Sequence, residues 1–63
     1  MSTNTERIAK AHDALIPYLE FNDDMESITD LLTDLRHYAD ARKIDFYKAL
    51  DMSYQHYLAE KGE

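Results

Sequence analysis

Apolar residues recur at intervals of three and four along three stretches of the chain, which short polar links separate. An α-helix turns once every 3.6 residues, so this spacing gathers the apolar side chains on one face of a helix. The pattern predicts helices over residues 4–16, 24–41 and 46–60. We therefore expect an all-α fold in which residues 1–63 form a single small three-helix domain.

The first stretch opens with a helix-start signal and closes near a proline. Thr3 and Glu6 fit a capping box, in which each side chain bonds a free backbone N–H of the other residue. Pro17 has no backbone N–H and disfavours helical geometry at the preceding residue, so we expect the helix to end or kink there. Residues 17–21 are then expected to form a short apolar turn over the core. The apolar stripe comprises Ile8, Ala11, Leu15 and Leu19, with His12 and Ile16 beside it.

The second stretch carries the strongest helical pattern in the chain. Asp23 followed by Glu26 is another capping box, and acidic residues in a first turn suit the positive end of the helix dipole. The stripe expected to be buried comprises Met25, Ile28, Leu31, Leu32, Leu35, Tyr38, Ala39 and Arg42.

The third stretch begins with Asp45 as its expected N-cap, and Lys61 followed by Gly62 is typical of a helix C-terminus. The link over residues 41–44 is short, so the second and third helices are expected to form an antiparallel hairpin with the first helix laid across it. The stripe expected to be buried comprises Phe46, Ala49, Leu50, Ser53, Tyr54, Tyr57 and Leu58.

The length of the chain limits the apolar surface that it can bury alone, since a domain of 63 residues buries only about 60% of its unfolded surface. The chain has no cysteine, so neither a disulfide nor a thiolate-bound metal can stabilise it. Stability must come from close helix packing or from a partner, and a homodimer is one such arrangement. No stretch is apolar enough for a membrane span or a signal peptide, so we expect a cytoplasmic protein that does not bind membranes.

The net charge of −6 is concentrated in residues 20–34, which hold six acids and no Lys or Arg. These acids are Glu20, Asp23, Asp24, Glu26, Asp30 and Asp34. The flanking segments are balanced, with two residues of each sign in residues 1–19 and five of each sign in residues 35–63. A local negative field of this kind steers cationic partners and disfavours nucleic acid, whose phosphates require Lys and Arg.

Part of this window forms a carboxylate ladder, because Glu26, Asp30 and Asp34 are four residues apart and so share one face of a helix. His37 follows about one turn later. Three interpretations are open: a solvated face, a surface that binds a protein or mimics the charges of nucleic acid, and a divalent-cation site with oxygen ligands. We assign no metal and no cofactor to the chain.

Histidine and tyrosine supply the remaining candidate chemistry. His12, His37 and His56 fall one per helix, and they are either separate boundary residues or ligands that the fold brings together. Tyr47 and Tyr54 share one face of the third helix, where tyrosines serve in core packing or at an interface. No catalytic residue is assigned, because the serines lack the glycine context of a nucleophile elbow and the chain has no cysteine.

Residues 28–61 (ITDLLTDLRHYADARKIDFYKALDMSYQHYLAEK) resemble small acidic helical proteins that phages and other mobile elements encode. The landmarks of this resemblance are residues 30–37, Asp45–Phe46 and His56–Tyr57. The resemblance implies a small accessory protein that acts by binding, for instance to a host or defence protein.

The same segment is similar to the second half of the MazG-type all-α nucleotide pyrophosphohydrolases. In that family, an ExxE on one helix and an ExxD on the next hold magnesium around a triphosphate. Here Glu26 and Asp30 are spaced as ExxxD, Ser27 stands where the glutamate should be, and no ExxE precedes them. This similarity therefore implies a shared helical hairpin without the metal-binding residues.

The sequence favours a non-enzymatic accessory protein, such as a phage-encoded inhibitor or regulator, whose acidic window binds a basic face of a protein partner. Tyr47 and Tyr54 are expected to add apolar area to this contact or to a dimer contact. Two alternatives stay open. One is a Mg²⁺-dependent nucleotide pyrophosphohydrolase assembled from more than one chain, and the other is a purely structural oligomer with a solubilising acidic face.

Overall fold

The computed structural model describes residues 4–61, which form the helices α1 (Asn4–Leu19), α2 (Asp24–Ala41) and α3 (Phe46–Lys61). The expected all-α fold with three helices is confirmed, and α2 and α3 begin at their predicted residues. Thr3 and Gly62, the expected signals at the two ends of the chain, lie outside the described residues. No helix within the described range is long and apolar enough to cross a membrane.

Two aspartates start α2 and α3 as the sequence predicts. Asp23 Oδ1 accepts a hydrogen bond of 2.8 Å from the backbone N–H of Glu26. Asp45 Oδ1 accepts one of 3.0 Å from the backbone N–H of Lys48. Each bond satisfies one of the N–H groups that the start of a helix leaves without an intrahelical acceptor, so both helix starts are fixed by local chemistry.

The end of α1 differs from the prediction, because the helix continues through Pro17 to Leu19, three residues beyond the expected end. A proline in the last turn removes a single backbone hydrogen bond, and the side chains that follow it regain contacts within the fold. Tyr18 and Leu19 are half-buried parts of α1, whereas Phe21 is 84% exposed. The apolar turn expected over residues 17–21 therefore does not form, and that prediction is wrong.

The C-terminus of α2 is closed by a Schellman motif that turns the chain toward α3. The backbone N–H of Ile44 donates to the carbonyl of Ala39 at 2.8 Å, and that of Lys43 donates to the carbonyl of Asp40 at 3.2 Å. Lys43 takes the left-handed conformation that the motif needs, with a φ of 56°. Glycine usually occupies this position, so the residue type did not reveal the motif.

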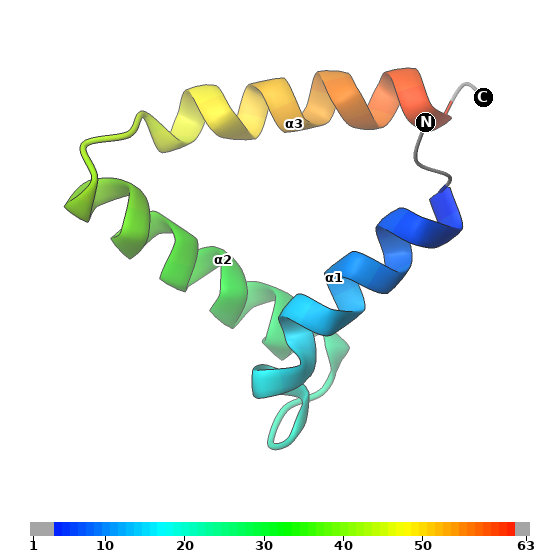
Figure 1. Cartoon of the computed structure of the whole chain (residues 1–63). Helices are drawn as coiled ribbons and strands as arrows, with labels where there is room; N and C mark the ends of the chain where they lie inside the picture. The colour runs from blue at the N-terminus through cyan, green and yellow to red at the C-terminus, as the bar shows by residue number, and fades with distance from the viewer. Residues whose placement is uncertain (1–3, 62–63) are drawn as a thin grey trace.

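The three helices lie along the sides of an open triangle (Figure 1). The chain reverses direction between α2 and α3, but the two helices diverge from their link, and α1 contacts α2 more extensively than α3 does. The radius of gyration is 13.1 Å, against about 10.6 Å for a compact chain of 63 residues. The overall extents of 32 × 29 × 17 Å describe a flat molecule.

The apolar stripes of α2 and α3 remain largely in contact with solvent. Within residues 4–61, the buried side chains are those of Ala39 and Ser27. Leu31 and Phe46 are half-buried. The exposed members of the two stripes include Met25, Ile28, Leu32, Leu35, Tyr38, Leu50, Tyr54, Tyr57 and Leu58. The prediction that these stripes are buried is wrong for the single chain, because helices on the sides of a triangle do not cover one another's faces.

Candidate functional site

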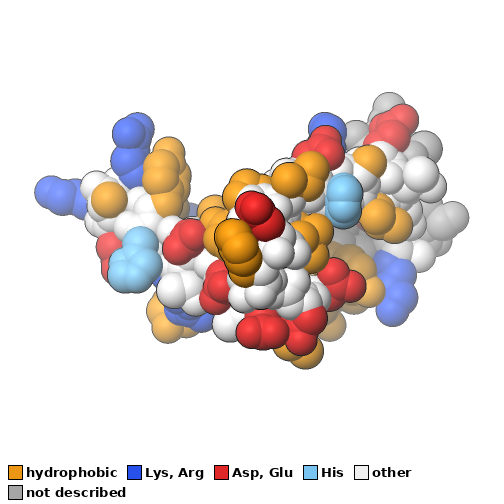
Figure 2. Space-filling view, turned by 90° about the horizontal axis from the view of Figure 1, so that it is seen from below, with side chains coloured by type: hydrophobic (Ala, Val, Ile, Leu, Met, Phe, Trp, Pro, Cys, Tyr) orange, Lys and Arg blue, Asp and Glu red, His pale blue; other side chains and the backbone are white. Residues whose placement is uncertain are grey.

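The six acids of residues 20–34 lie around the corner where α1 meets α2. Two of them lie in the link between α1 and α2 and four lie along α2 as far as Asp34, and all of them are exposed. We call this surface the acidic corner; it comprises Glu20, Asp23, Asp24, Glu26, Asp30 and Asp34. Figure 2 looks onto this corner and shows acidic side chains gathered there, with Lys and Arg toward the two sides of the molecule.

Two of these carboxylates are held by residues from the end of α1 and the link. The Tyr18 hydroxyl donates to Asp34 Oδ2 at 2.6 Å. Asn22 Nδ2 donates to Asp30 Oδ2 at 3.1 Å and to the carbonyl of Tyr18 at 3.1 Å. Tyr18 and Asn22 were not predicted as members of the site, because both lie outside the helix that carries the aspartates they contact. The turn between α1 and α2 brings them together.

The environment of Tyr18 keeps its hydroxyl protonated. The hydrogen bond to Asp34 raises the pKa of Tyr18 above its usual value of about 10. Partial loss of solvent and the negative charges of Asp34 and Asp30 raise it further, because a tyrosinate beside two carboxylates is unfavourable. Tyr18 therefore acts as a hydrogen-bond donor that fixes the position of Asp34.

The negative charge of the acidic corner is not neutralised within the described part of the chain. None of its six carboxylates forms an ion pair with any residue from 4 to 61. Arg7 pairs instead with Glu60, between α1 and α3. The acidic corner consequently presents its charges to solvent or to a partner.

The interpretation of the carboxylate ladder as a cation site gains no support from the geometry. Among residues 4–61, no three His, Cys, Asp or Glu side chains are grouped so that they could hold a metal ion. His12, His37 and His56 are exposed on three different helices.

The two tyrosines expected to take part in partner binding lie on a different surface. Tyr47 is at the start of α3, where the Arg36 guanidinium carbon lies 5.4 Å from its ring centre and 4.7 Å from that of Phe46. Arg36 Nη1 also donates to the Tyr47 hydroxyl at 3.3 Å. Tyr54 lies in the middle of α3, with its ring stacked on that of Tyr57 at 6.4 Å between centres. Both tyrosines belong to α3, which does not take part in the corner where α1 meets α2 (Figure 1).

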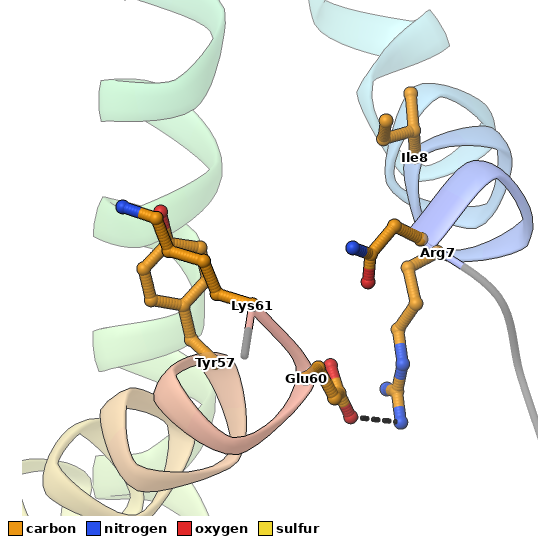
Figure 3. Close-up of a pocket in the computed structure, with 6 residues that line it drawn as sticks. Arg7, Ile8, Tyr57, Glu60 and Lys61 are labelled. Atoms are coloured by element: carbon orange, nitrogen blue, oxygen red, sulfur yellow. Dashed lines mark ion pairs between the residues drawn. The ribbon is translucent and has the colours of Figure 1, made fainter. Parts of the chain in front are cut away.

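The angle between α2 and α3 holds a shallow groove of about 230 Å³, which we call the apolar groove. Its lining residues are Leu32, Leu35, Phe46, Ala49, Leu50 and Ser53. A second hollow of about 320 Å³ lies between the start of α1 and the end of α3. Figure 3 shows Ile8 and Tyr57 on its two sides and the ion pair between Arg7 and Glu60 spanning it. Most of the apolar residues in these two hollows were predicted to lie in a core.

Comparison of the chain with protein-family models, with curated proteins and with solved structures found no match. Two surfaces of the structure are candidates for binding, the acidic corner and the apolar groove.

Proposed function

We propose that this protein is a non-enzymatic binding protein whose acidic corner contacts a basic face of a protein partner. The observation that carries the proposal is the set of six exposed carboxylates that have no ion pair within residues 4–61. Like charges one helical turn apart repel one another, so a cationic surface that neutralises them is attracted strongly. Phosphates would add to this repulsion, so a protein is favoured over nucleic acid as the partner.

The hydrogen bonds of Asp30 and Asp34 favour binding of a partner by these two carboxylates. Asn22 and Tyr18 hold their carboxylates, so less side-chain freedom is lost when a partner binds. Arginine is the residue that we expect opposite them, because its planar guanidinium bonds carboxylate oxygens in pairs. The resemblance of residues 28–61 to phage-encoded helical proteins supports the same proposal, with a regulator or inhibitor acting in the cytoplasm.

The proposal is tested by capture of proteins from a bacterial lysate on the tagged full-length chain, at low and at high salt, with identification by mass spectrometry. We expect a partner with a basic surface that is retained at low salt and released at high salt. A double variant, Asp30→Lys with Asp34→Lys, should slow association with this purified partner at least about tenfold. The matched control is Asp40→Lys with Asp51→Lys, which changes the net charge equally outside the acidic corner.

Circular dichroism on both double variants establishes that the helices are intact before binding is compared. Capture that is unchanged in the Asp30→Lys, Asp34→Lys variant contradicts the proposal. Equal loss of binding in both double variants also contradicts it, because total charge rather than the acidic corner would then determine binding.

A further inference from the structure

The apolar groove is neutral and incompletely covered in the single chain. Leu32, Leu35 and Leu50 are 40%, 43% and 40% exposed, although they lie within the apolar stripes of α2 and α3. None of the six lining residues carries a charge, and Ser53 is the one with a polar side chain. Such a surface matches another neutral apolar surface.

The exposed area of the chain is larger than a compact monomer would have. The accessible surface is 5546 Å², whereas a compact monomer of 7.4 kDa exposes about 4,200 Å². The excess is about 1,300 Å². Obligate homodimers bury about 1,000 Å² or more from each copy, so the excess is comparable with the area that one copy buries in a stable dimer.

The apolar groove is uncharged and the acidic corner is negatively charged, so we expect different partners to bind them. A basic partner is attracted to the corner, not to a groove that has no charge. Successive residues of a helix are about 100° apart, which places Leu32 about 160° around α2 from both Asp30 and Asp34. A protein seated on the groove can therefore leave the carboxylate ladder accessible.

We propose that a second copy of this chain covers the apolar groove about a two-fold axis. Two-fold symmetry brings residues at the centre of a contact opposite their own counterparts. Leu32 and Leu35 lie near the midpoint of α2 (Asp24–Ala41), so α2 and its copy can pair antiparallel along their whole length. Phe46 and Leu50 of α3 in each copy extend the contact. The acidic corner stays exposed on both copies, and this proposal does not rest on the proposed function.

The mass of the full-length chain in solution tests the proposal, measured by sedimentation equilibrium over a wide range of concentrations. We expect a mass of twice 7.4 kDa. Leu50→Asp places a charge in the groove and should raise the dimer dissociation constant at least about thirtyfold. Met52→Asp is the matched control, because Met52 lies on the opposite side of α3 and should leave the constant unchanged.

A second measurement does not depend on how well Leu50→Asp folds. The chain has no cysteine, so a single introduced cysteine reports one contact. Leu32→Cys lies within one residue of the midpoint of α2 and so beside the two-fold axis, and it should form a disulfide between copies at least about tenfold faster than Thr33→Cys, which faces away from the groove.

A monomeric mass at all concentrations overturns the proposal, and so does an assembly larger than two copies. The apolar groove is not the interface if the two cysteine variants form the disulfide at equal rates. The same conclusion follows if the Leu50→Asp chain dimerises as tightly as the unchanged protein. The Asp30→Lys, Asp34→Lys variant should remain a dimer while losing its basic partner, so failure of one proposal is distinguishable from failure of the other.

Discussion

The Arg7 guanidinium Nη2 lies 2.6 Å from Glu60 Oε2, and this ion pair joins the start of α1 to the end of α3. It spans the third corner of the triangle, where Ile8 and Tyr57 stand on either side of an open hollow (Figure 3). The Arg7 side chain is 55% exposed and that of Glu60 is 27% exposed. Water competes for a pair with this exposure, so the corner is closed by a weak contact.

A double-mutant cycle with Arg7→Ala and Glu60→Ala measures that contact. We expect a coupling of about 0.2–1 kcal/mol in the free energy of unfolding, decreasing as salt screens the charges. Urea unfolding at one fixed protein concentration provides the values, since self-association would otherwise shift them. Lys10→Ala combined with Glu60→Ala is the control and should be additive. The absence of coupling at low salt would show that the pair does not close the corner in solution.

Stability at alkaline pH depends on Tyr18. Its pKa is raised in the folded chain by Asp34, so the folded state binds the phenolic proton more tightly than the unfolded state. The stabilising contribution is complete below the unfolded pKa of about 10 and is lost as the pH rises through the higher folded pKa. We expect the thermal midpoint to fall more steeply between about pH 9 and pH 11 in the unchanged protein than in Tyr18→Phe. Parallel curves for the two proteins would contradict this linkage.

The buried side chain of Ser27 in α2 leads to a prediction about stability. Its side chain is 0% exposed, and its hydroxyl has no hydrogen-bond partner within residues 4–61. A buried hydroxyl without a partner is unfavourable, and alanine is also the better helix former. Ser27→Ala should therefore raise the free energy of unfolding by about 0.5–1.5 kcal/mol. Ser27→Leu should destabilise the chain, because no space is available for a larger side chain.

The opposite result for Ser27→Ala, a loss of stability in thermal or urea unfolding, would show that the hydroxyl is hydrogen-bonded in solution. Thr33→Ala is a suitable comparison on the same helix. The Thr33 hydroxyl donates to the carbonyl of Thr29 at 2.9 Å and is exposed, so its removal should change stability by less than about 0.5 kcal/mol.

The features predictable from the sequence are those that depend on residues within one helical turn. Asp23 and Asp45 were predicted as N-caps because a cap bonds a backbone group three residues away, and both bonds are present. The arrangement of the helices was not predictable in this way. The spacing of the apolar residues around Leu32 and Leu50 indicates that one face of each helix is covered by another apolar surface. It does not indicate whether that surface belongs to the same chain or to a partner.

The contacts of the acidic corner illustrate the same limit. Tyr18 reaches Asp34 across sixteen residues and Asn22 reaches Asp30 across eight, so the link between α1 and α2 determines both contacts. The continuation of α1 through Pro17 places Tyr18 where it can make this bond, and sequence rules for proline favoured an earlier end. The roles of the acidic corner, Tyr47 and Tyr54 in partner binding stay predictions.

Asp23 allows the structural and the binding roles of one carboxylate to be separated. Its Oδ1 caps α2, and its charge belongs to the acidic corner. Asparagine is as good an N-cap as aspartate, so Asp23→Asn should keep the free energy of unfolding within about 0.5 kcal/mol, whereas Asp23→Ala should lower it by about 1 kcal/mol. If the corner acts through charge, both variants should weaken binding of the basic partner at low salt to a similar degree. Full binding by Asp23→Asn would show that Asp23 caps α2 but does not contribute its charge to binding. The control is Asp45→Asn at the N-cap of α3, which should retain both stability and binding.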